Sequence, residues 1–177
     1  MNTDRISKRA RLLSALATAL LLVIPAGAAL IMATGGFDVE SLRAAYGVQV
    51  TPDVLATGPT LIWFAVEVVK LAVLLWVIWC ARAWLLACAG GRVFSGQTAR
   101  RIQQIGIGLI GLAVAHVLGH TIAVLALTWG NPAGERALTI SFGSTELFLL
   151  LAAGLVTLFG WIQAEAAQLD AENKGFV

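Results

Sequence analysis

The sequence predicts an all-α membrane protein, an antiparallel bundle of four transmembrane helices. The chain of 177 residues is 59% hydrophobic and only 12% charged, whereas soluble domains carry about 25% charged residues. Its apolar residues gather in four runs, each long enough for the roughly 20 helical residues that cross about 30 Å of hydrocarbon. The runs are continuously apolar, which favours helices over the alternating strands of a membrane barrel.

The four runs and their connections form a single transmembrane domain. The predicted spans are residues 12–34, 61–81, 102–129 and 138–162. The connections are an outer loop (35–60), an inner loop (82–101) and a tail (163–177). A soluble fold of this length could not bury so much apolar surface, and the mean hydropathy of +0.86 agrees with lipid as the solvent.

The basic residues predict the orientation of the spans. Nine of the 12 Lys and Arg residues flank one side, namely Arg5, Lys8, Arg9, Arg11, Arg82, Arg92, Arg100, Arg101 and Lys174. Only Arg43 and Arg136 lie in the opposite loops, and Lys70 lies inside a span. Because basic loops stay in the cytoplasm, both termini are expected there. Trp63 and Trp129 are then expected at the outer interface, in the aromatic belt.

The first span has a second interpretation as a secretory signal peptide. Ala26-Gly27-Ala28 has the small-x-small form of a cleavage site and follows a basic start. The apolar run of residues 12–34 exceeds the usual h-region of about 7–15 residues, which favours a retained span. Cleavage would leave three spans and an amino end outside.

Local signals predict where helices begin and end in the loops. Asp38 is expected to cap a short helix that runs through Tyr46, and Thr51-Pro52-Asp53 is expected to start another short turn. Ser95 is the predicted N-cap of a helix that continues into the third span, with Phe94 as its hydrophobic staple. The polar tail is expected to extend the fourth helix beyond the membrane.

Two stretches carry a resemblance to a known family. Gly91-Arg92-Val93-Phe94-Ser95 leads into Ala99-Arg100-Arg101-Ile102, and the tail reads Gln168-Leu169-Asp170-Ala171-Glu172-Asn173 before Phe176-Val177. They resemble the bacterial four-span family labelled domain of unknown function twenty-nine seventy-five, over most of the chain. The resemblance implies a protein of the bacterial inner membrane, and it supplies no catalytic residues.

A stripe of small residues on the third span predicts a close helix contact. Its members are Gly108, Gly111, Ala115 and Gly119. In lipid, helices associate through small residues that let the backbones approach, and through polar contacts. The stripe is expected to pack inside the bundle; the alternative is contact with a second copy of the chain.

Five ionisable residues are predicted to form a polar layer in the outer half of the membrane. At a rise of about 1.5 Å per residue, Glu67, His116, His120 and Glu146 fall at similar depth, with Lys70 about a turn lower. Glu67 and Lys70 are three residues apart on one helix face, which predicts an ion pair. Charges at this depth are costly and need partners.

The polar layer allows three interpretations. His116 and His120, four residues apart on one helix, can bind a divalent metal together with Glu67 and Glu146. The same groups can pass protons, because histidine titrates near neutral pH. The third interpretation is structural: the layer fixes the order of the helices. No other cofactor is expected.

The sequence contains no motif that names a reaction. A nucleotide-binding loop and a Gly-x-Ser-x-Gly elbow are both missing from it, so the protein is not expected to be an enzyme. Cys80 and Cys88 are expected to be free thiols that fill space. We expect a non-enzymatic interaction or regulatory protein; the alternative is transport or sensing of protons, ions or a divalent metal. The expected partners are membrane lipid and a second copy or another membrane protein, and not nucleic acid.

Overall fold

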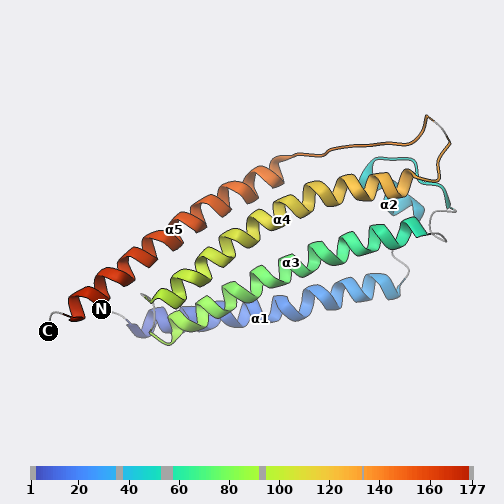
Figure 1. Ribbon diagram of the computed structural model, residues 1–177. Coiled ribbons are helices and arrows are strands. Elements are labelled where there is room, and N and C mark those ends of the chain that lie inside the picture. The colour runs from blue at the N-terminus through green and yellow to red at the C-terminus, as the bar shows by residue number, and fades with distance from the viewer. Residues whose placement is uncertain (1–2, 35–37, 53–57, 92–94, 133, 176–177) are drawn as a thin grey trace.

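The computed structural model describes residues 3–34, 38–52, 58–91, 95–132 and 134–175. Its helices are α1 (Thr3–Ala33), α2 (Val39–Tyr46), α3 (Gly58–Ala89), α4 (Gly96–Thr128) and α5 (Ser144–Gly175). These described residues contain no strand. The predicted all-α class is therefore confirmed, with the short helix α2 added at one end (Figure 1).

The four long helices are those of an integral membrane protein. Each of α1, α3, α4 and α5 contains an apolar stretch long enough to cross a bilayer. Only 6% of this stretch in α1 and 28% in α4 is buried against protein. So many apolar side chains remain uncovered because lipid is their solvent. The chain is thus a multi-pass membrane protein, and α4 is its most enclosed helix.

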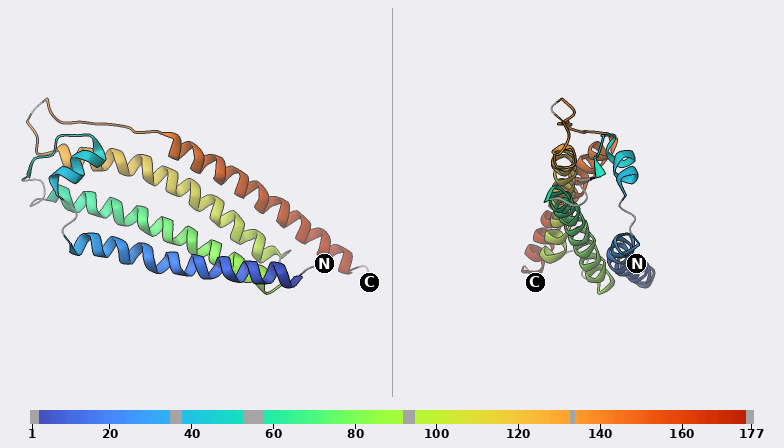
Figure 2. Two further views of the ribbon diagram at one scale, coloured as in Figure 1. Left: turned by 180° about the vertical axis from the view of Figure 1, so that it is seen from behind. Right: turned by 90° about the vertical axis from the view of Figure 1, so that its right-hand side faces the viewer.

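The long helices lie side by side in an open row. α1 packs along α3, α3 along α4 and α4 along α5, and no comparable contact joins α1 to α5 within the described residues. The start of α1 and the end of α5 lie at the same end, and α2 lies at the other (Figures 1 and 2). The row leaves the faces of α3 and α4 without a further long helix across them.

The predicted small-residue stripe faces α3. A Cβ atom added at Gly108 would lie 2.5 Å from an α3 valine methyl, and one at Gly119 would lie 2.9 Å from another. Gly111 faces the same helix at an ordinary contact distance of 3.9 Å, and Ala115, between them on the stripe, is half-buried. The stripe therefore packs against another helix of the same chain. The seam between α4 and α5 depends on two other glycines, Gly106 and Gly160.

The predicted caps are present where the structure describes them. The Asp38 carboxylate accepts the Ser41 N–H at 2.7 Å, and α2 ends at Gly47, whose φ of 66° suits glycine. Ser95 and Thr98 form a reciprocal capping box at the start of α4. Phe94 and Asp53 lie outside the described residues.

A small apolar core joins α2 to the start of α3 and the end of α4. It consists of Leu42, Val50, Trp63, Ala123 and Leu127. Trp63 is only 6% exposed, because it is packed in this core beneath α2. Trp129 is exposed, as expected of a belt residue.

The amino-terminal half of α1 is attached to α3 by polar contacts. The Arg82 guanidinium donates to the Thr18 hydroxyl at 2.8 Å, and the Ser7 hydroxyl donates to the Ala89 carbonyl at 3.1 Å. Cys80 and Cys88 are free and buried, as expected.

The start of the fourth long helix differs from the prediction. Residues 138–143, expected as its first turns, are not helical, and α5 begins at Ser144. Two local features explain this. The stretch alternates apolar with β-branched or small polar residues, a pattern that suits extended backbone. Glu146 then accepts the Gly143 N–H at 2.7 Å, which caps a helix start at this point. At its other end α5 extends into the tail, as predicted.

Candidate functional site

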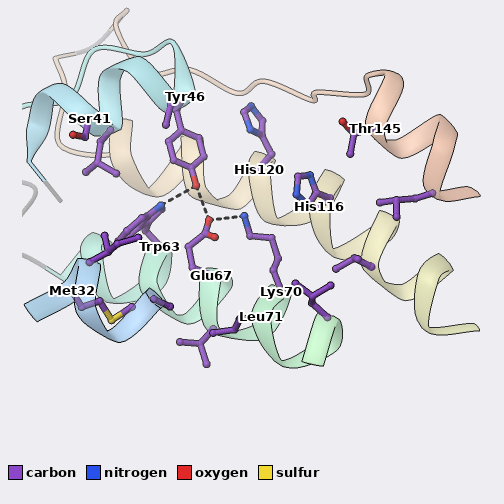
Figure 3. Close-up of a pocket in the computed structure, with 18 residues that line it drawn as sticks. Met32, Ser41, Tyr46, Trp63, Glu67, Lys70, Leu71, His116, His120 and Thr145 are labelled. Carbon is purple, nitrogen blue, oxygen red and sulfur yellow. Dashed lines mark hydrogen bonds and ion pairs between the residues drawn. The ribbon is translucent and has the colours of Figure 1, made fainter. Parts of the chain in front are cut away.

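The predicted ion pair on α3 is present and belongs to a larger network. The Lys70 ammonium lies 2.5 Å from Glu67 Oε1. The same oxygen accepts the Tyr46 hydroxyl from α2 at 2.8 Å. The Tyr46 oxygen in turn accepts the Trp63 indole N–H at 2.9 Å. Indole, phenol, carboxylate and ammonium thus form one continuous chain of polar contacts (Figure 3).

This network links α2 to the membrane helix α3. Tyr46 ends α2, while Trp63, Glu67 and Lys70 follow each other at intervals of four and three along α3, on one helix face. Burial, followed by the Glu67 hydrogen bond, raises the pKa of Tyr46. The phenol therefore stays protonated and donates its hydrogen to the carboxylate.

His116 and Glu146 form the second polar contact, between α4 and α5. His116 Nδ1 lies 3.1 Å from Glu146 Oε1. The other carboxylate oxygen accepts the Gly143 N–H, so both oxygens of Glu146 have partners. Glu146 is buried, whereas the His116 side chain is 48% exposed. The contact therefore fixes the start of α5 against α4 and leaves part of the imidazole accessible.

His120 lies one turn above His116 on α4. Its ring packs against the Tyr46 ring, with centroids 5.4 Å apart and a tilt of 30°. Its nitrogens make no hydrogen bond within the described part of the chain. His120 therefore approaches the Glu67 network through an aromatic contact and keeps free hydrogen-bonding capacity.

A cavity of about 790 Å³ lies beside both polar contacts. All five helices line it. Its polar lining includes Tyr46, Glu67, Lys70, His116, His120 and Thr145, and most other lining residues are aliphatic, such as Ile31, Leu71, Leu74, Leu112 and Leu149. Figure 3 shows Tyr46, Glu67, Lys70, His116 and His120 between α2, α3 and α4, with Thr145 at the start of α5.

The four predicted metal ligands do not form one shell. Glu67 is bound by Lys70 and Tyr46, and Glu146 is bound by His116 and Gly143. His120 stacks on a tyrosine instead of sharing a ligand position with His116. Among the residues that the structure describes, no three His, Cys, Asp or Glu side chains are gathered for a metal. Each carboxylate instead contacts a nitrogen on its own side of the cavity, Glu67 that of Lys70 and Glu146 that of His116.

Sequence reasoning overlooked Tyr46 and Trp63 as members of the site. Tyr46 was treated only as the end of a loop helix. One signal was available: Val39, Leu42 and Tyr46 lie on one side of α2, so that this short helix has an apolar face to bury.

Comparison of the chain with family models, curated proteins and solved structures gives no match.

Proposed function

We propose that the protein acts by binding and not by catalysis, and that its ligand is a single-chain amphiphile held in the cavity between α1 and α5. The observation that carries the proposal is the cavity itself, which is lined by every helix and has polar groups at one end only. In this proposal the protein is a regulatory or sensory component of the bacterial inner membrane, with both termini in the cytoplasm.

The size and lining of the cavity support an amphiphile. A volume of about 790 Å³ falls within the range of roughly 300–1,000 Å³ that ligand pockets occupy. Its aliphatic part is formed by residues such as Leu71, Leu74 and Leu112, which suit a hydrocarbon chain. α1 and α5 do not pack against each other within the described residues. A lipid-soluble molecule can therefore enter the cavity laterally from the membrane.

The polar end supports a head group that accepts hydrogen bonds. Both carboxylates are already bound by nitrogen donors. Free donors remain on Lys70, which has three hydrogens to share, and on the His120 ring. An uncharged or anionic acceptor, such as a carboxyl group, suits this excess of donors better than a cation does.

Photo-crosslinking in vesicles tests the proposal. The probe is a long-chain fatty acid that carries a diazirine, and the labelled peptides are mapped by mass spectrometry. Leu112→Trp fills the cavity from α4 and should abolish labelling of its lining. Leu118→Trp, on the exposed side of the same helix, is the matched control and should label like the parent. Equal labelling of both variants would refute the proposal.

A second candidate function is proton or ion handling, including divalent metals. The contact between His116 and Glu146 favours it, because a half-exposed imidazole beside a buried carboxylate is a suitable proton acceptor. His116→Ala and Glu67→Gln should then reduce ion flux or metal content in vesicles. Glu165→Gln, on an exposed residue near the end of α5, is the control. Unchanged flux and metal content in folded variants would remove this function.

A further inference from the structure

The segment 138–143 is extended, and not helical, where the chain enters the membrane. Its upper end is bound to α4, because the Ala137 N–H donates to the Thr128 hydroxyl at 3.2 Å. Its lower end is bound to α4 through Gly143, Glu146 and His116. Along α4 these two points are about 18 Å apart, which about six extended residues span. The segment therefore runs nearly straight beside the outer half of α4 (Figures 1 and 2).

The depth of its lower end follows from the seam between α4 and α5. A Cβ atom at Gly160 would lie 3.3 Å from the Ile102 side chain, so these two residues are level. Ile102 follows the basic pair Arg100-Arg101, which marks the inner interface. Counted from this level, His116 and Glu146 both lie about 21 Å up. With about 30 Å of hydrocarbon, they lie about 9 Å beneath its outer edge.

The backbone of the segment is unpaired at this depth. Residues 138–142 make no backbone hydrogen bond within the described part of the chain. Their side chains are exposed, with Ile140 at 72% and Phe142 at 56%, so protein does not cover them. Exposed irregular backbone does not occur in hydrocarbon, where each unpaired group costs several kcal/mol; at membrane depth it lines water-filled cavities.

The side chains of the segment suit a boundary between lipid and water. Leu138, Ile140 and Phe142 alternate with Thr139 and Ser141. In extended backbone, successive side chains point to opposite sides. Strands that separate lipid from an aqueous lumen show the same alternation. One side of the segment can therefore face lipid while the other faces water.

From these observations we infer that the segment 138–143 borders a water-filled vestibule, which brings solvent from the outer surface down to His116 and Thr145. The vestibule hydrates the polar end of the cavity, and the aliphatic end stays dry. The inference does not depend on an amphiphilic ligand, because it follows from the backbone and the depth of α5 alone.

Two cysteine variants at matched depth test the vestibule. Thr145 lines the cavity, whereas Leu147, about 3 Å deeper, is exposed on α5 and is not among the lining residues. Thr145→Cys and Leu147→Cys are reconstituted in vesicles and treated with a charged methanethiosulfonate on both faces. Peptide mapping separates each new thiol from Cys80 and Cys88. The reagent needs water and a thiolate, so Thr145→Cys should react at least about tenfold faster.

Each other outcome overturns the inference. If both thiols react equally fast, the start of α5 lies outside the hydrocarbon. If neither reacts, the space beside His116 is dry. Ser141→Cys and Phe142→Cys form a second pair on opposite sides of the segment, for use if Thr145→Cys does not fold. Fast reaction of Ser141→Cys alone supports the vestibule, and any other result from this pair refutes it.

Discussion

The close contact between α3 and α4 predicts a graded response to alanine at three glycines. Gly108, Gly111 and Gly154 all lie inside membrane-spanning helices. A Cβ atom at Gly108 would lie 2.5 Å from Val77 and 2.9 Å from the Trp76 ring, and one at Gly154 would meet nothing within 4 Å. The three sites therefore share one chemical change and differ in the space that receives the methyl group.

The magnitudes follow from two opposing effects. Alanine favours a helix over glycine by up to about 1 kcal/mol, and Gly154→Ala should show this gain alone. At Gly108 the neighbours are a β-branched side chain and an indole, which cannot move easily, and overpacking costs about 1–3 kcal/mol. Gly108→Ala should thus be about 1–3 kcal/mol less stable than Gly154→Ala. Gly111→Ala, with its nearest neighbour at 3.9 Å, should resemble Gly154→Ala.

Reversible unfolding in mixed micelles, driven by dodecyl sulfate and followed by tryptophan fluorescence, measures these differences. The parent chain sets the reference free energy of unfolding. If Gly108→Ala and Gly154→Ala agreed within about 0.5 kcal/mol, the close approach of α4 to α3 would be refuted. If Gly111→Ala were the least stable, the rotation of α4 that the structure assigns would be wrong.

Three further predictions concern the polar contacts. Glu67→Gln should reduce the free energy of unfolding by about 1–3 kcal/mol because it leaves the Lys70 ammonium without a charged partner. In a double-mutant cycle, adding Lys70→Met should recover most of this loss. Additive losses from the two substitutions would contradict the pairing. Tyr46→Phe should cost about 1–3 kcal/mol in the same unfolding assay, because it removes the hydroxyl that donates to Glu67 and accepts from the Trp63 N–H. No change would show that these two bonds contribute nothing. Hydrogen bonds from the Ser41 side chain and then its backbone lower the pKa of Asp38. Its contribution to α2 should therefore be complete above the unfolded-state pKa and be lost as the pH falls through the lowered one. Hydrogen-exchange protection factors in α2, which are corrected for the intrinsic pH dependence of amide exchange, should fall over this range in the parent and not in Asp38→Asn. An equal fall in both proteins would contradict the prediction.

Much of the architecture follows from signals that act within a few residues. The four spans depend on the length and apolar character of their own sequence. The Asp38 and Ser95 caps are bonds to an amide three residues away, and the pair of Glu67 and Lys70 is a contact between neighbouring turns. The sequence predicts such features well because the helix itself sets their geometry.

The candidate site was predicted only in part for the opposite reason. The sequence predicts Glu67, His116, His120 and Glu146 at one level of the membrane, but equal depth does not decide which side chains meet. The rotation of α4 directs His116 to Glu146, and α2 folds back so that Tyr46 reaches Glu67 first. A four-ligand metal shell would require a different rotation of the helices about their axes.

The sequence by itself therefore determined the solvent, the four long helices, the caps and the contacts between neighbouring helical turns, because hydrophobicity and helix geometry are local properties of the chain. Only the tertiary structure decided the open row of helices, the partners of each carboxylate, the late start of α5 and the cavity. These features depend on the rotation and vertical offset of helices that are far apart in sequence. Small-residue contacts such as those at Gly108 and Gly160 determine that rotation and that offset.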